Sequence, residues 1–340
     1  MKKIIYIFLI ITANINAQTV ANRNSQIKEI ADKIEKYYIL ENVGKDLSKK
    51  LKSEIQNKTF DNLSNQEFAD SLSVYLTKNS NDLHFNLLYR PNHQKEPIDE
   101  KKLLKQYDAI NKQWNYGFEK VQRLDGNIGY IQYTGFPEGN KNARKILDAT
   151  MSFVSNTNTL IIDLRNNRGG DGKMEKLFLS YFFKQKTKLG TSYTRYIDKT
   201  KATYTCEKVN GQKYLNKQIY ILVNNSTISA AEGFAYNLKQ YKKAIIIGEK
   251  TYGAANPVKV FFISSLYQLF IPITEVKNSV TQKNWEHKGL DIDIKIDTEK
   301  ALIKAHILAL KKLLKNKIKT ELTIKEMMEK ISNLKIRLKE

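Results

Sequence analysis

The 340-residue chain is poor in cysteine, in proline and in long apolar runs. Its single cysteine, Cys206, rules out an intramolecular disulfide, so the fold depends on a buried core, which a chain of this length can supply. Beyond residue 12, no segment is long and apolar enough for a transmembrane helix. The sequence therefore excludes a disulfide scaffold and a multi-span membrane protein.

Acidic residues are also scarce relative to basic ones. The chain has 35 aspartates and glutamates against 57 lysines and arginines, a formal net charge of +22. Such a balance favours anionic partners. However, only eight of the basic residues are arginine, and the lysines are spread along the whole chain. We interpret the charge as a lysine-rich surface and expect no nucleic-acid target. An adhesin-like protein that binds anionic polymers through its lysines remains an alternative.

The N-terminus combines a basic head, a short apolar stretch and a small residue at a plausible cleavage point. Met1-Lys2-Lys3 precedes an apolar run over residues 4–12, and Ala17 stands before Gln18. This arrangement is typical of a secretory signal peptide. We therefore predict a signal peptide over residues 1–17, export to the periplasm or beyond the cell, and no stable membrane insertion.

The remaining chain divides by its periodicity into three parts. Residues 18–110 carry apolar residues at helical spacing and a capping box at Ser64–Glu67, which predicts a helical N-terminal domain. Residues 111–300 alternate apolar strands with helical segments, which predicts an α/β domain. Residues 301–340 predict basic helices, of which the last is amphipathic. The strands expected in the α/β domain cover residues 126–133, 159–164, 219–223, 244–248, 258–263 and 267–273.

The most informative segment covers residues 224–234, Asn-Asn-Ser-Thr-Ile-Ser-Ala-Ala-Glu-Gly-Phe, between a predicted strand and a predicted helix. Free amides and the positive end of a helix favour negative charge at such a turn. A serine placed there can attack a carbonyl carbon, and the neighbouring amide can hold the resulting oxyanion. The alternative is that Ser226, Thr227 or Ser229 only caps the helix.

Three further segments also carry functional signals. Residues 163–170, Asp-Leu-Arg-Asn-Asn-Arg-Gly-Gly, follow a strand, and their glycines let backbone amides approach a ligand. Residues 248–257 form a tight turn after another strand, and residues 284–293 contain Glu286 and His287. Together, the four segments resemble the S41 serine peptidases, the tail-specific or C-terminal-processing protease family. They resemble most closely the branch that includes the tricorn core protease and the interphotoreceptor retinoid-binding protein.

The resemblance implies a ClpP/crotonase-like α/β spiral and the roles of several residues. It implies Ser229 as the nucleophile and His84 as the base, because the branch with a lysine base would have lysine at Ala254. Histidine titrates near pH 7, which suits this role. His287 is the second candidate for the base. The interval between Pro91 and Tyr116 is too short for the PDZ domain of the processing proteases.

The resemblance also implies the acid and the oxyanion hole. Glu286 would orient the histidine, while the amide of Ala230 and that of Gly169 or Gly170 would hold the oxyanion. We expect no metal and no other cofactor. The predicted function is hydrolysis of peptides or proteins through an acyl-enzyme. A catalytically weak or inactive module that binds apolar ligands or peptides is the alternative, since the retinoid-binding relatives are carriers. The sequence does not indicate an oligomeric state.

Overall fold

The structure is a computed structural model that describes residues 22–91, 100–315 and 321–339. The predicted signal peptide, residues 1–17, lies outside these ranges. The chain forms two compact units, which take up residues 1–97, 193–200 and 256–275, and residues 98–192, 201–255 and 276–340. In the described part of the chain, no helix is long and apolar enough to cross a membrane.

The first unit packs helices against a small antiparallel sheet. A helix over residues 22–37 is followed by α2 (Glu41–Gln56), α3 (Asn65–Ser80), β1 (Asn86–Tyr89), β9 (Val258–Ile263) and β10 (Tyr267–Pro272). The capping box predicted before α3 is confirmed, because the Ser64 and Glu67 side chains each accept the other residue's amide. The strand order is β1-β10-β9, and Leu87 pairs with Leu269. Both leucines are buried in the helix–sheet core.

The second unit is a three-layer α/β structure around a six-stranded sheet. The sheet runs in the order β12-β8-β7-β4-β3-β2, and every neighbouring pair is parallel except β2 and β3. Its strands are β2 (Phe118–Leu124), β3 (Ile128–Tyr133), β4 (Thr159–Asp163), β7 (Gln218–Val223), β8 (Ala244–Gly248) and β12 (Ile294–Lys295). The expected strands at 126–133, 159–164, 219–223 and 244–248 are thus confirmed.

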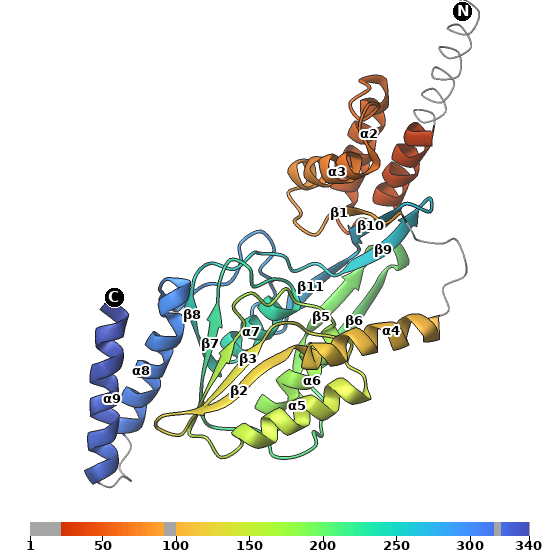
Figure 1. The fold of residues 1–340 in the computed structure, drawn as a ribbon. Coiled ribbons are helices and arrows are strands. Elements are labelled where there is room, and N and C mark those ends of the chain that lie inside the picture. Colours follow the sequence, from red (N-terminus) through yellow and green to blue (C-terminus); the bar gives the residue numbers. More distant parts are fainter. Residues whose placement is uncertain (1–21, 92–99, 316–320, 340) are drawn as a thin grey trace, which may run out of the picture. The chain divides into compact units, whose positions relative to one another are not determined.

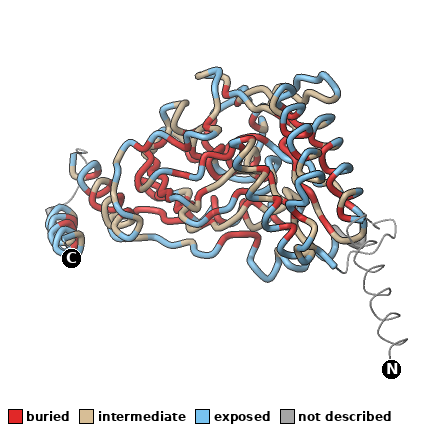
Figure 2. Tube along the Cα trace, turned by 90° about the horizontal axis from the view of Figure 1, so that it is seen from above, coloured by how far each residue is buried: buried red, intermediate tan, exposed pale blue. Residues whose placement is uncertain are grey.

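Helices cover both faces of this sheet (Figure 1). The covering helices are α5 (Lys141–Val154), α6 (Gly172–Leu179), α7 (Ala230–Gln240), α8 (Ala301–Leu314) and α9 (Glu321–Lys339). The unit also contains α4 (Glu100–Gln113) and the 3-10 turns η1 (Asn115–Gly117), η2 (Ser180–Phe182) and η4 (Thr298–Lys300). Helices α5, α6 and α7 pack on one face, against Leu160 and Ile162, while α8 and α9 pack on the other face, against Ile161. Because β4 is covered on both sides, all five of its residues are buried. Figure 2 shows buried stretches, in red, along many segments of the chain.

Three strands have residues in both units, namely β5 (Lys188–Thr194), β6 (Lys199–Tyr204) and β11 (Thr274–Asn278), with η3 (Arg195–Ile197) between the first two. They pair in the order β11-β5-β6. Strands β5 and β6 therefore belong to a three-stranded sheet in which β5 is the central strand. The predicted amphipathic C-terminal helix is confirmed as α9. Met327 lies on its buried face, and Met328 is exposed.

Candidate active site

Ser229 lies at the turn that joins β7 to α7, in a backbone conformation that non-glycine residues rarely adopt. Its φ and ψ are 59° and −119°, and it is the N-cap residue of α7. Holding a side chain at such a positive φ costs about 1–3 kcal/mol, and the surrounding structure must supply that energy. A serine on a strained strand-to-helix turn is the arrangement of the nucleophile elbow.

The turn that contains Ser229 (residues 224–229, the serine turn) is hydrogen-bonded to the turn that follows β4 (residues 164–170, the glycine turn). Thr227 Oγ1 donates to the carbonyl of Leu164 at 2.9 Å, and the amide of Ile228 donates to the carbonyl of Asn167 at 3.0 Å. Strands β4 and β7 are parallel neighbours, so both turns lie at the carboxyl edge of the sheet, where α/β folds bind ligands. The two turns therefore form one surface around Ser229.

Gly169 and Gly170 are required as glycines by their close contacts. A Cβ on Gly169 would lie 2.8 Å from Ser229 Cβ and 2.9 Å from the amide nitrogen of Ala230. A Cβ on Gly170 would lie 1.9 Å from the carbonyl oxygen of Phe136, and both glycines have positive φ. The structure thus brings Ser229, Ala230 and Gly169 close together.

The two glycine amides differ in their hydrogen bonding. The amide of Gly169 donates to Asn167 Oδ1 at 2.9 Å. Gly170 forms a parallel bridge with Phe136, in which Gly169 O accepts from Phe136 and the Asp171 amide donates to Phe136 O. In a parallel bridge the two residues that flank the bridged residue make the hydrogen bonds, and successive residues direct their polar groups to opposite sides. The amide of Gly170 therefore points away from Phe136.

Glu232 connects the serine turn to the turn at residues 251–255. Its buried carboxylate accepts hydrogen bonds from Ser229 N at 3.0 Å, Thr251 Oγ1 at 2.6 Å, Gly253 N at 2.8 Å and Ala254 N at 3.0 Å. Burial raises the pKa of Glu232 above its usual value, and these hydrogen bonds oppose the shift. The sequence contained Glu232 in the serine motif, but this role depends on a contact with residues about 20 positions away.

Replacing Glu232 with glutamine should destabilise the protein and slow catalysis. A glutamine has one acceptor oxygen and one NH2 group, so part of the four-donor cluster loses its acceptor. We expect a loss of about 2–4 kcal/mol in the free energy of unfolding, measured by urea denaturation, and a roughly 10- to 100-fold lower kcat/KM from the displaced serine turn. The control is Glu207→Gln, at an exposed side chain. Equal effects of both changes would contradict this role of Glu232.

The turn at residues 251–255 also holds Glu286. The amide of Ala255 donates to Glu286 Oε2 at 2.6 Å, and Trp285 Nε1 donates to the carbonyl of Ala254 at 3.1 Å. Three consecutive amides, those of residues 253–255, are therefore bound by Glu232 and Glu286. Ala254 is fully buried, and Lys250 is exposed.

The histidines occupy different environments. His84 belongs to the first unit and lies in the turn between α3 and β1, where its amide donates to Asp82 Oδ1 at 3.0 Å. Its ring Nδ1 is 3.9 Å from the same oxygen, too long for a hydrogen bond. Burial lowers the pKa of His84, and the charge of Asp82 opposes the shift. Since Ser229 and Glu286 belong to the second unit, their pairing with His84 is part of the proposal below.

Of the other histidines, His287 lies near Glu286 and His306 is buried in α8. His287, the second candidate for the base, has a φ of 62°, and its ring Nδ1 is 3.8 Å from Glu286 Oε1. His306 is buried in α8, and its Nε2 is 3.0 Å from the carbonyl oxygen of Asp125, which gives it a structural role. His93 lies outside the described residues.

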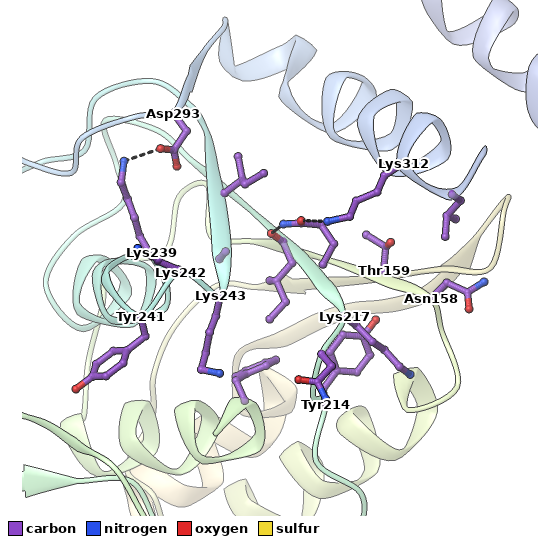
Figure 3. Close-up of a pocket in the computed structure, with 17 residues that line it drawn as sticks. Asn158, Thr159, Tyr214, Lys217, Lys239, Tyr241, Lys242, Lys243, Asp293 and Lys312 are labelled. Atoms are coloured by element: carbon purple, nitrogen blue, oxygen red, sulfur yellow. Dashed lines mark hydrogen bonds and ion pairs between the residues drawn. The ribbon is translucent and has the colours of Figure 1, made fainter. Parts of the chain in front are cut away.

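A lysine-rich cavity of about 740 Å³ lies away from the serine turn. It is lined by Thr159, Gln218 and Ala244, the first residues of β4, β7 and β8, and therefore opens at the edge of the sheet opposite Ser229 (Figure 3). Two of its lysines have polar partners within the protein. Lys239 pairs with Asp293 at 2.8 Å, and Lys312 donates to Gln218 at 2.5 Å.

A second cavity, of about 580 Å³, lies at the glycine turn. Its lining includes Trp114, Phe136, Pro137, Arg168 and Gly169. Since Gly169 is also in close contact with the serine turn, this cavity adjoins Ser229.

Sequence comparison finds relatives among the processing peptidases. The chain is 30% identical over 141 residues to the chloroplastic carboxyl-terminal-processing peptidase 2 of Arabidopsis thaliana, and 30% identical over 185 residues to a probable CtpA-like serine protease of Staphylococcus aureus. The matches cover 40% and 52% of this chain, and 26% and 34% of those relatives. The chain thus spans about a quarter to a third of the length of these curated relatives.

Structure comparison supports the fold, and a family model identifies the family. The photosystem II D1 C-terminal processing protease superposes with a TM-score of 0.53 at 14% identity, over 81% of this chain and 93% of that one. This likeness supports the predicted α/β fold with N-terminal helices. The model of peptidase family S41 matches residues 127–296, which include the glycine turn, the serine turn and Glu286. This chain therefore belongs to peptidase family S41, a family of serine-type peptidases.

Proposed function

We propose that this protein is an exported serine peptidase that hydrolyses peptide bonds in peptides or proteins. The observation that carries the proposal is the strained conformation of Ser229, held beside the Ala230 amide and the glycine turn. Maintaining this conformation costs stability, and a helix cap does not require it. The proposed export rests on the sequence of residues 1–17.

In the proposed mechanism, Ser229 Oγ attacks the peptide carbonyl carbon while His84 accepts the hydroxyl proton. His84 then donates this proton to the leaving amine, and water hydrolyses the acyl-enzyme. The lowered pKa of His84 supports its role as base, because the ring is neutral near pH 7. Glu286 orients His84, and the bond from the Ala255 amide fixes the position of its carboxylate.

The amides of Ala230 and Gly170 are the proposed oxyanion donors. Ala230 N–H belongs to the first turn of α7, where helix amides lack intrahelical acceptors and the helix dipole favours negative charge. Gly170 is favoured over Gly169 because the Gly169 amide already donates to Asn167. Each such donor typically contributes about 100- to 1000-fold to the rate.

The alternative assignments of base and acid are His287 and Asp82. Support for His287 as the base comes from its proximity to Glu286 in the same unit. Support for Asp82 as the acid comes from its position next to His84. However, Asp82 already accepts a hydrogen bond from the Tyr38 hydroxyl at 3.1 Å. Separate substitutions of these residues distinguish the assignments.

A fluorophosphonate probe tests the proposal directly. An activated Ser229 should form a covalent adduct at that residue, detectable by mass spectrometry, and Ser229→Ala should remain unlabelled. If the protein binds peptides in the cavity at the glycine turn but is neither labelled nor able to hydrolyse them, it would instead be a carrier. That outcome would overturn the peptidase assignment.

A further inference from the structure

The cavity at the glycine turn lies next to the proposed nucleophile. Gly169 lines the cavity, and a Cβ on this residue would lie 2.8 Å from Ser229 Cβ. A ligand in the cavity is therefore adjacent to the carbonyl that Ser229 would attack. Every residue that lines the cavity belongs to the second unit, so its geometry is independent of the first unit.

Aromatic and other apolar groups form much of the cavity lining. Phe136 is buried beneath it, and Pro137 lies beside it. Trp114, just after the end of α4, has 71% of its surface exposed. Exposed tryptophans commonly anchor ligands because one ring supplies a large apolar area at little entropic cost. The lining therefore fits a large apolar side chain of a peptide.

The cavity has one charged residue, Arg168. Its side chain is exposed and forms no hydrogen bond or ion pair with the described residues. The nearest acid along the chain, Asp171, is occupied as the N-cap of α6, where it accepts from Lys173 N at 2.6 Å and Met174 N at 3.1 Å. A guanidinium presents a planar pair of donors that matches a carboxylate.

We propose that this cavity is a substrate subsite that selects peptides with a carboxylate next to a large apolar side chain. Arg168 binds the carboxylate, and Trp114 contacts the apolar side chain. This inference rests on the proposed peptidase function and specifies its substrate class. The net charge of +22 attracts such acidic peptides over longer distances.

Matched fluorogenic peptides test the role of Arg168. A peptide library in which glutamate and glutamine alternate at each position near the scissile bond should show a preference for glutamate at one position. We expect a roughly 3- to 10-fold higher kcat/KM for glutamate, as for a partly exposed ion pair. Arg168→Gln should reduce this ratio to about 1, Arg168→Lys should restore part of it, and Arg168→Glu should favour a lysine peptide. Peptides with a free or an amidated C-terminus show whether the carboxylate is terminal.

Two further variants separate recognition from folding. Arg123→Gln changes an exposed arginine near the end of β2 and should keep the glutamate preference. Trp114→Ala should lower kcat/KM roughly 10-fold for both peptides without changing their ratio. Cleavage without glutamate preference, or with the same preference in Arg168→Gln, would overturn the subsite but leave the peptidase function intact.

Binding measurements keep the inference independent of turnover. Calorimetric titration of Ser229→Ala with the glutamate and glutamine peptides should show the same preference, which the added Arg168→Gln change removes. If the wild-type protein cleaves no peptide but this preference in binding is present, the peptidase function fails and the subsite is retained. Equal binding of both peptides would overturn the subsite.

Discussion

Replacement of Ser229 by alanine is expected to lower kcat/KM for peptide hydrolysis about 10⁴- to 10⁶-fold. The reason is that the change removes the attacking oxygen and with it the acyl-enzyme route. The alanine variant should fold normally, because the Ser229 amide keeps its bond to Glu232 and the turn keeps its backbone contacts. Turnover of a quenched peptide and thermal unfolding measure the two effects.

Ser229→Gly should abolish activity but give a more stable protein than Ser229→Ala. At a φ of 59°, glycine lacks the Cβ that makes this conformation unfavourable, so relief of strain should raise the free energy of unfolding by about 1 kcal/mol relative to Ser229→Ala. Both variants should be inactive. A glycine variant less stable than the alanine variant would show that the turn is not strained, and turnover in either variant would remove Ser229 as nucleophile.

The local sequence patterns predicted most of the second unit. Apolar runs located β4, β7 and β8, since strands covered on both faces have few polar residues. The same patterns missed β2, whose residues are largely exposed, and α4, which was included in the N-terminal domain. Edge strand β2 lacks a regular alternation of buried and exposed residues, so its position depends on tertiary contacts.

The sequence also could not predict contacts between distant segments. Nothing in the pattern of residues 258–272 indicates that β10 pairs with β1, about 180 residues earlier, because both strands have ordinary compositions. Likewise, the serine motif includes Glu232, but only the fold brings residues 251–254 to its carboxylate. The strain at Ser229 depends on these long-range contacts, which explains why the sequence alone left a helix cap as an alternative.

Substitution of His84 should produce the second large effect. His84→Ala is expected to lower kcat/KM about 10⁴- to 10⁶-fold, because the serine hydroxyl then has no base. His287→Ala is the matched control and should retain activity within about tenfold, since its ring is not required as base in the proposed mechanism. The reverse result would assign the base to His287.

Replacement of the orienting acid should have a smaller effect. Glu286→Gln should lower kcat/KM about 10²- to 10⁴-fold, and a larger effect of Asp82→Asn would identify Asp82 as the orienting acid.

The pH dependence provides an independent measure of the His84 environment. Burial lowers its pKa in the folded protein, so the neutral ring persists below pH 6.5, and kcat/KM should fall only at lower pH. In the unfolded chain the ring takes up a proton at about pH 6.5. The unfolded state therefore binds more protons below this pH, and the free energy of unfolding should decrease as the pH falls. His84→Gln should weaken this decrease, measured by urea denaturation between about pH 7.5 and 5.5. An unchanged pH dependence in the variant, with a kinetic midpoint above 6.5, would show that His84 is not a buried neutral base.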